Sequence, residues 1–235
     1  MARVIPPDRY HELLEAATTV FIAQGYRGTQ MRDVAQEMGL SSGTLYGYVV
    51  SKEALFAEVL LYADTQTPVC LPSTLPVEVP PDGTIANLMQ QRLGTETQRL
   101  EKLLERMPRQ DIRKRLVRFF SELYRTLDRN RTAIKVLDRC AREHRELAAI
   151  WYPAGRFSVL NALTAFLESR SRSRSIRRRF EPALSARTAM EIVNFWALHR
   201  HWDASPQTID ESAVEQNVVE LALAVLLKDD TKNPQ

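Results

Sequence analysis

The 235-residue chain contains few cysteines and glycines, two and eight respectively. Cys70 and Cys140 form neither a CxxC motif nor a Cys/His spacing typical of metal ligands, so they are interpreted as reduced thiols. No apolar run approaches the roughly 18 residues that span a bilayer. Residues 1–7 lack the hydrophobic core of a signal peptide. We therefore expect a cytoplasmic protein.

Motifs of the common enzyme classes are also missing from the sequence. It contains no GxSxG, no HExxH and no phosphate-binding loop, and no Glu-x-x-His pair for a carboxylate-bridged metal site. His199 and His201, two residues apart, point to different faces of a helix and form a poor chelate. We expect no catalytic residues, no metal and no cofactor, and hence a protein that is not an enzyme.

An excess of positive charge is absent where nucleic acid would be expected to bind. The chain carries a net charge of +3, but residues 1–62 hold five basic and seven acidic side chains, five minus seven, or −2. Bulk charge therefore gives no argument for nucleic acid in this segment. The densest basic run lies at residues 170–179. It is either a second nucleic-acid contact or, as we favour, a solvated or disordered connection.

Apolar residues recur at helical spacing along the chain, and none alternates with period two, so an all-α fold is expected. The first helices are expected over residues 8–24, from Thr29 to about residue 38, over 42–48 and from Lys52 onward. Thr29, Ser41 and Ser51 are candidate N-caps, and glycines 25 and 39 suit helix ends.

A proline-rich segment, residues 68–83, interrupts this pattern and predicts a loop or linker between two parts of the chain. Beyond it, helices are expected over residues 84–106, 110–129, 131–148, 155–169, 182–203 and 209–228. Pro108 and Pro153 mark two of the interruptions.

Residues 25–56 have the order helix, glycine turn, helix, cap, helix, which is typical of a helix-turn-helix. The second helix of that motif lies in the major groove of DNA. Here it is rich in small and hydroxyl side chains, and only Leu45 and Val49 are apolar enough to anchor it. An exposed face of hydroxyls suits contacts to phosphates and base edges.

This segment resembles the tetracycline-repressor (TetR) family over about residues 8–62, notably in Gly25-Tyr26, Gly28-Thr29, Asp33-Val34-Ala35, Gly39-Leu40-Ser41, Gly43-Thr44-Leu45-Tyr46 and Ser51-Lys52-Glu53. The resemblance implies a three-helix DNA-binding domain, residues 1–52, and a helical effector-binding and dimerisation domain, residues 53–235. It further implies a ligand-responsive repressor that binds a palindromic operator as a homodimer and is released by a small-molecule effector. Carried over by position, the DNA contacts are Thr29, Gln30, Arg32, Ser41, Ser42, Gly43, Thr44, Tyr46, Gly47, Tyr48 and Lys52.

The last two helices carry apolar residues on wide arcs, so each is expected to be buried on more than one side. A symmetric four-helix interface between two subunits supplies the second side, and a single-chain bundle core is the alternative. The expected interface residues are Ala189, Val193, Trp196, Val214, Val218, Leu221 and Val225.

An effector pocket is expected among aromatic and polar side chains of the C-terminal helices, although each of them also suits plain core. The candidates are Phe119, Phe120, Tyr124, Trp151, Phe157, Asn161, Asn194 and His199. Two other interpretations stay open at this point. One is an all-helical ligand-binding or scaffold protein without DNA affinity, and the other is an activator in place of a repressor.

Overall fold

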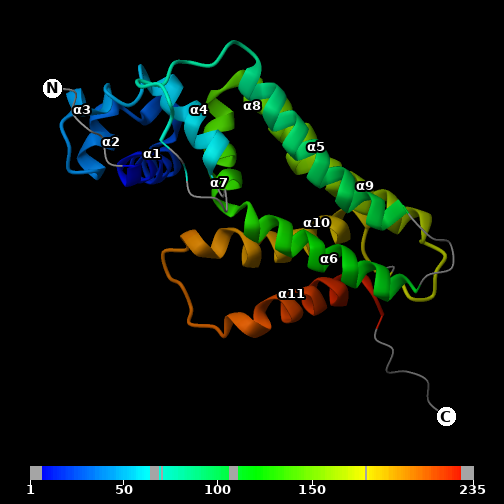
Figure 1. Ribbon diagram of the computed structural model, residues 1–235. Coiled ribbons are helices and arrows are strands. Elements are labelled where there is room, and N and C mark those ends of the chain that lie inside the picture. The colour runs from blue at the N-terminus through cyan, green and yellow to red at the C-terminus, as the bar shows by residue number, and fades with distance from the viewer. Residues whose placement is uncertain (1–6, 64–68, 70, 106–110, 178, 229–235) are drawn as a thin grey trace. The chain divides into compact units, whose positions relative to one another are not determined.

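The computed structural model describes residues 7–63, 69, 71–105, 111–177 and 179–228 (Figure 1). Within these ranges the chain is helical, and its only β-type pairings are two isolated bridges. The expected all-α class is therefore confirmed. Cys70, Pro68, Pro108 and Arg178 lie outside the described residues.

The helices follow the expected order closely. They are α1 (Pro7–Gly28), α2 (Met31–Glu37), α3 (Ser42–Leu45), α4 (Lys52–Tyr62), α5 (Thr84–Glu105), α6 (Ile112–Arg129), α7 (Arg131–Cys140), the 3₁₀ turn η1 (Ala141–Glu143), α8 (Arg145–Ile150), the π-helical turn η2 (Trp151–Phe157), α9 (Ser158–Ser169), α10 (Pro182–Ala197), the 3₁₀ turn η3 (His199–Trp202) and α11 (Glu211–Leu226).

The helix expected over residues 42–48 ends at Leu45, and the helix expected over residues 182–203 ends at Ala197, before the 3₁₀ turn η3. Two further boundaries differ from the expectation for physical reasons. The helix expected over residues 131–148 is broken by η1, where the backbone of His144 turns to an extended conformation. Pro153 does not end a helix but lies within the wider π-helical turn η2, which leads directly into α9. Proline breaks a regular α-helix partly because its ring clashes with the carbonyl four residues earlier, whereas the hydrogen bonds of a π-helical turn join residues five apart.

The chain forms two compact units. Unit 1 comprises residues 1–91 and 132–151, and unit 2 comprises residues 92–131 and 152–235. The helix-turn-helix therefore packs together with α4, the start of α5 and the later segment from α7 to α8. These units are defined by packing. The division by function that we expect between residues 52 and 53 stays a prediction.

An aromatic and apolar core holds unit 1 together. Tyr10 and Phe21 are fully buried in it, and the Tyr10 hydroxyl donates a hydrogen bond to Glu58. Burial, together with this carboxylate, raises the pKa of Tyr10 far above its ordinary value. The rings of Phe21, Tyr26 and Phe56 pack with one another, and His144 from the segment after η1 joins them at 5.3 Å from Tyr26.

The proline-rich segment is bound back onto unit 1 over its described residues. The Val77 N–H donates to the Tyr48 carbonyl at 2.8 Å, and the Val50 N–H donates to the Val77 carbonyl at 3.0 Å. These two bonds form a parallel bridge between Val49 and Val77. These hydrogen bonds therefore fix this part of the expected linker beside the end of the helix-turn-helix.

Unit 2 is built on α6, α9, α10 and α11, whose apolar faces form one core cluster. Figure 1 shows α6, α10 and α11 side by side. Arg125 on α6 pairs with Glu215 on α11 at 2.9 Å, and Arg200 holds both carboxylate oxygens of Glu211 at 2.7 and 2.6 Å. The second pair ties η3, the turn that follows α10, to the start of α11.

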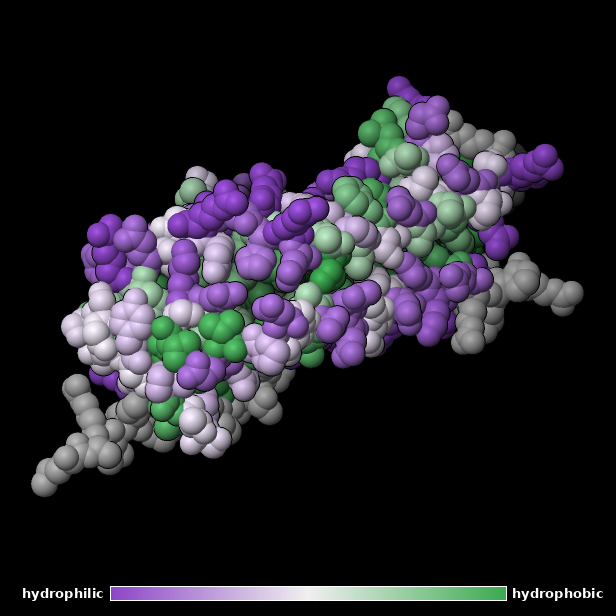
Figure 2. All heavy atoms as spheres, turned by 90° about the horizontal axis from the view of Figure 1, so that it is seen from above, coloured by the Kyte–Doolittle hydropathy of each residue, from purple (hydrophilic) through white to green (hydrophobic). Residues whose placement is uncertain are grey.

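On the face shown in Figure 2, hydrophilic side chains predominate and hydrophobic ones form separate small patches. None of the described helices combines the length and apolarity that crossing a bilayer requires. The described residues also contain no cluster of His, Cys, Asp and Glu side chains that could hold a metal ion.

Candidate nucleic-acid interface and ligand pocket

Helices α2 and α3 form the expected helix-turn-helix. Gly39 lies between them with a φ of 65°, a left-handed conformation that glycine adopts without steric cost. Ser41 is the N-cap of α3, as expected. Leu45 and Val49 are fully buried, which confirms them as the anchors of this short helix.

Most of the expected DNA-contact residues are accessible. Gln30, Arg32, Ser41, Gly43, Tyr46 and Gly47 are exposed, and Ser42, Thr44 and Lys52 are partly exposed. The Arg32 side chain retains 72% of its accessible surface, although Asp33 lies 3.7 Å away. The hydroxyls of Ser41 and Thr44 are hydrogen-bonded to each other at 2.9 Å. This bond orients both hydroxyls at the exposed start of α3.

Two of the expected contact residues are buried instead. Thr29 is 1% exposed, and its hydroxyl donates to the Gly25 carbonyl at 2.7 Å. It is not the N-cap of α2 either, because Gln30 holds that place and its N–H donates to the Asp33 carboxylate at 2.9 Å. Tyr48 is 5% exposed, so its ring belongs to the core. The Thr29 and Tyr48 side chains were therefore wrongly assigned to the exposed surface.

Lys52, at the start of α4, has a structural role that the sequence did not reveal. Its Nζ donates to the Tyr26 carbonyl at 2.8 Å and to the Thr29 carbonyl at 2.9 Å. It also lies 4.6 Å from the centre of the Tyr26 ring, within range of a cation–π interaction. Lys52 thus fixes the turn between α1 and α2 to α4.

The segment α7–η1 also forms hydrogen bonds that fix the turn between α1 and α2. Arg139 donates to the Gln24 carbonyl at 2.8 Å, and the Arg27 N–H donates to Glu143 at 2.6 Å. This N–H and the neighbouring Arg139 lower the pKa of Glu143. Sequence analysis missed both residues because their partners lie more than a hundred positions away. The only local signal was the i,i+4 spacing of Arg139 and Glu143.

The two glycines of the recognition segment differ in their surroundings. A Cβ placed on Gly43 would meet nothing closer than the Ser41 hydroxyl at 4.0 Å, whereas one on Gly47 would lie 3.3 Å from the Thr44 carbonyl oxygen. Packing within the subunit therefore requires no glycine at position 43. Its small size instead leaves the backbone at the start of α3 open to close approach from outside.

The eight residues expected to line an effector pocket are divided between core and surface positions. Phe119 and Phe120 are fully buried in the core of unit 2, ring against ring at 5.0 Å. Trp151 lies in unit 1, and Phe157 and Asn161 are exposed. Three pockets among the described residues have volumes of about 530, 180 and 80 Å³, and none of these three is lined by Phe119, Phe120, Tyr124, Trp151, Phe157, Asn161, Asn194 or His199.

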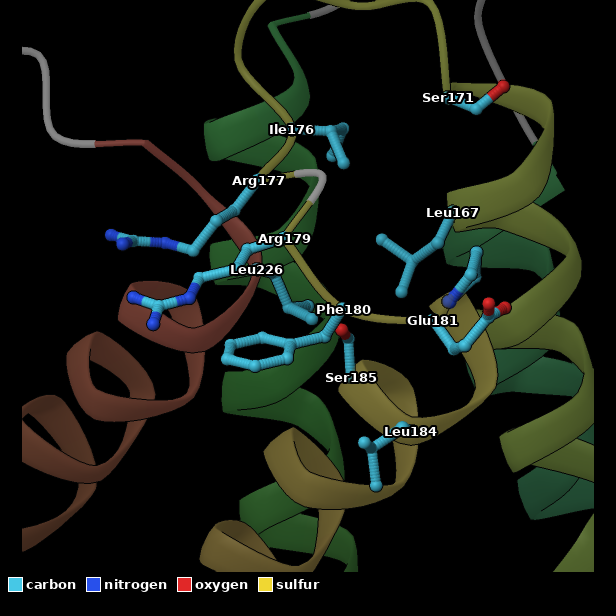
Figure 3. A pocket seen from close by; sticks show the side chains of 11 residues that line it. Leu167, Ser171, Ile176, Arg177, Arg179, Phe180, Glu181, Leu184, Ser185 and Leu226 are labelled. Atoms are coloured by element: carbon cyan, nitrogen blue, oxygen red, sulfur yellow. The ribbon is translucent and has the colours of Figure 1, made fainter.

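The largest of the three pockets lies in unit 2, around the arginine-rich segment (Figure 3). Its walls come from the end of α9, the segment before α10, the start of α10 and the end of α11. Its volume falls within the range of small-molecule sites, roughly 300–1,000 Å³. A cavity of ligand size is therefore present in this unit, at a place the sequence did not indicate.

The expected dimer-interface residues divide into two groups. Ala189, Val193, Val214 and Val218 are at most 3% exposed, because they form the core between α10, α11 and their neighbours in the same subunit. Assigning them to a subunit interface was therefore wrong. Leu221 is 52% exposed, and Trp196 and Val225 are partly exposed. These three stay available to a partner.

Comparison with known proteins concerns mainly the N-terminal part of the chain. Residues 13–59 match the family described as bacterial regulatory proteins, tetR family. The HTH-type transcriptional repressor KstR2 of Mycolicibacterium smegmatis is 44% identical over 55 residues, which are 23% of this chain and 27% of that protein. The match thus spans about a quarter of the length of this curated relative.

Solved structures extend the likeness to the whole fold. The ketosteroid transcriptional regulator KstR2 of Mycobacterium tuberculosis is similar with a TM-score of 0.57, at 17% identity over 97% of this chain and 98% of that one. A bacterial regulatory protein of the tetR family from Rhodococcus RHA1 gives a TM-score of 0.52, at 19% identity over 93% and 97%. At these identities the likeness shows the arrangement of helices alone.

Proposed function

The chain belongs to the TetR family of bacterial regulatory proteins, and from this premise we propose that it is a ligand-responsive repressor acting in the cytoplasm. Residues 1–52 bind operator DNA, and residues 53–235 provide dimerisation and effector binding. Members of this family are transcriptional regulators and not enzymes, in keeping with the absence of catalytic motifs from the sequence.

The observation that carries the proposal is the exposed start of α3. A four-residue helix anchored by the buried side chains of Leu45, Tyr48 and Val49 presents Ser41, Gly43 and Tyr46 outward. Hydroxyls and an unobstructed backbone at a helix start suit phosphates and base edges. Because the head has no excess of positive charge, affinity rests on such placed groups and on Arg32.

A homodimer brings two of these heads to one operator. On α10, Ile192 is partly exposed and Phe195 is 43% exposed, and on α11, Leu221 and Val225 are at least partly exposed. Each pair is spaced three or four residues apart, so it lies on one face of its helix. We assign these four residues to a symmetric interface between two copies, in place of the buried residues named from the sequence.

Repression follows from operator binding, and release follows if an effector binds the DNA-incompetent state more tightly than the competent one. The pocket of about 530 Å³ in unit 2 offers such an effector a place. An activator with the same architecture differs only in where its operator lies relative to the promoter.

Gly43 provides the test of the proposed DNA surface. Gly43→Val adds a side chain where the subunit has room for its Cβ, so the melting temperature should stay within a few degrees of that of the wild type. Binding to the DNA upstream of its own gene, measured by gel shift, should weaken by on the order of tenfold or more, because the added methyls separate α3 from the groove. Unchanged binding would place the DNA surface elsewhere. Absence of binding by the wild type to any DNA would favour the helical scaffold without DNA affinity.

A further inference from the structure

The pocket of about 530 Å³ in unit 2 combines an apolar wall with arginine side chains at its rim. Leu167, Ile176 and Leu226 contribute the apolar side and are nearly fully buried members of the core cluster. Phe180 and Leu184 add apolar surface that is more than half exposed. Among the described residues such a pocket keeps apolar area accessible, so it suits an apolar ligand.

The segment that carries the arginines is fixed on both sides of Ile176. The Arg177 N–H donates to the Leu226 carbonyl at 2.8 Å, and the Lys228 N–H donates to the Ser175 carbonyl at 2.9 Å. Ile176 pairs with Leu227 in an antiparallel bridge. The expectation of a solvated or disordered connection is therefore wrong for residues 175–177. The backbone bonds hold the pocket wall in place before any ligand binds.

Arginines outnumber carboxylates among the described residues that line the pocket. Arg177 and Arg179 line it together with Glu181, and because the Arg177 Nε already donates to the Leu227 carbonyl at 3.1 Å, Arg179 is the cation offered to a ligand. Figure 3 shows both arginines extending to one side, past the end of α11, while Glu181 lies on the opposite side near Leu167. No carboxylate lies within ion-pair distance of Arg179 among the described residues, and its guanidinium stands 5.5 Å from the Phe180 ring.

A further guanidinium stands beside this site in the sequence. Arg170, directly before the pocket residue Ser171, has a buried Nε with no hydrogen-bond partner among the described residues. Its charge acts on the nearly fully buried Arg115, whose pKa is lowered first by burial and then by Arg170. Among the described residues, positive charge is thus concentrated in this end of unit 2, where an anion would be favoured.

From this geometry we propose that the pocket binds a small amphipathic oxyanion. Its carboxylate or phosphate group pairs with Arg179, and its apolar chain lies over Leu167, Ile176 and Leu226. Guanidinium groups suit this role because their planar forks bind carboxylates and phosphates through two parallel hydrogen bonds. The arginine run thereby serves recognition of a small molecule and not of a second nucleic acid.

Binding here would act on the helices assigned to the dimer. Phe180 to Ser185 include the start of α10, and Leu226 ends α11, so a ligand between them biases how these two helices pack. This last step rests on the proposed function. Binding itself does not, because it can be measured on the full-length protein without DNA.

The direct test is calorimetric titration of the full-length protein at low ionic strength with probes that share a C8 chain. Octanoate and octyl phosphate should bind saturably, and the tighter of the two identifies the headgroup. Neutral 1-octanol should bind at least tenfold more weakly, since it lacks the charge-assisted hydrogen bonds. Inorganic phosphate should bind more weakly than octyl phosphate by a similar factor, since it lacks the apolar chain.

Two matched variants locate the site. Arg179→Gln should weaken binding of the C8 anions about tenfold. Arg172→Gln removes the same charge from the same exposed segment but lies outside the pocket, so it should leave binding nearly unchanged. Equal effects of the two variants, equal binding of octanol, or no saturable binding of either anion would overturn the proposal. Confirmed binding without any change in operator affinity would keep the site and reject only its role in induction.

Discussion

Lys52 joins three parts of the DNA-binding head through the Tyr26 carbonyl, the Thr29 carbonyl and the Tyr26 ring. A side chain used in this way contributes to folding as well as to any phosphate contact. Lys52→Ala should therefore lower the free energy of unfolding by about 1–2 kcal/mol, because two charge-assisted hydrogen bonds are lost. Urea unfolding measures this, and unchanged stability would contradict the bracing role.

Arg32 is the matched control for Lys52. It is largely exposed, and its nearest acidic neighbour, Asp33, is at 3.7 Å. Arg32→Ala should leave stability unchanged within about 0.5 kcal/mol. It should weaken DNA binding and reduce the slope of affinity against salt concentration by about one unit, as expected for one lost phosphate contact. A normal slope would mean that Arg32 does not meet a phosphate.

Cys140 is a thiol that the fold keeps unreactive. It is fully buried and donates to the Phe21 carbonyl at 3.8 Å, and burial raises its pKa to about 12. Since the thiolate is the reactive species, a thiol reagent near neutral pH should leave Cys140 unmodified in the native protein and modify it after unfolding in urea. The measurement uses a Cys70→Ser background, and rapid labelling of the native form would contradict the burial.

At the scale of helices, the apolar periodicity of α10 and α11 predicts some features of the structure and leaves others undetermined. It predicted both helices and their wide apolar faces correctly. It could not divide the faces between the subunit core and a partner, since Val218 and Leu221 carry the same hydropathy signal. Their burial, 2% against 52% exposed, depends on the placement of α6 and α10 against α11, which periodicity does not contain.

Leu221→Glu tests the proposed interface without disturbing the core. A carboxylate at this half-exposed position should give a folded monomer of about half the wild-type mass in sedimentation, because burying an unpaired charge between subunits is costly. Gln216→Glu adds the same charge on an exposed part of α11 off this face and should remain dimeric. A dimeric Leu221→Glu protein would show that this face of α10 and α11 is not the subunit interface. Val218→Glu is unsuitable, since it would unfold the subunit itself.

The helix-turn-helix could likewise be predicted from the sequence only in part. The order of helices, the Gly39 turn and the Ser41 cap follow from local residues and were predicted. The burial of Thr29 and Tyr48 was not, because it depends on contacts with the end of α1 and with the core. The pocket beside α9 likewise depends on the pairing of residues 175–177 with 226–228, fifty positions apart, for which the sequence carries no local signal.

At the scale of the whole molecule, the account predicts two recognition helices acting together. A two-fold dimer of helix-turn-helix heads places α3 and its copy in successive major grooves, about one helical turn apart. Each head alone has few charged groups, so a single half-site should bind weakly. The operator should therefore be read as a near-palindrome by the dimer and not as an isolated half-site by the monomer.

The most direct test of this central claim is selection of bound duplexes from a random DNA pool by the full-length protein, followed by sequencing. The account predicts enrichment of a near-palindrome whose half-sites are centred about one helical turn apart, lost with Gly43→Val and with monomeric Leu221→Glu. Failure of the wild-type protein to enrich any sequence, or enrichment of a single half-site without symmetry, would contradict it.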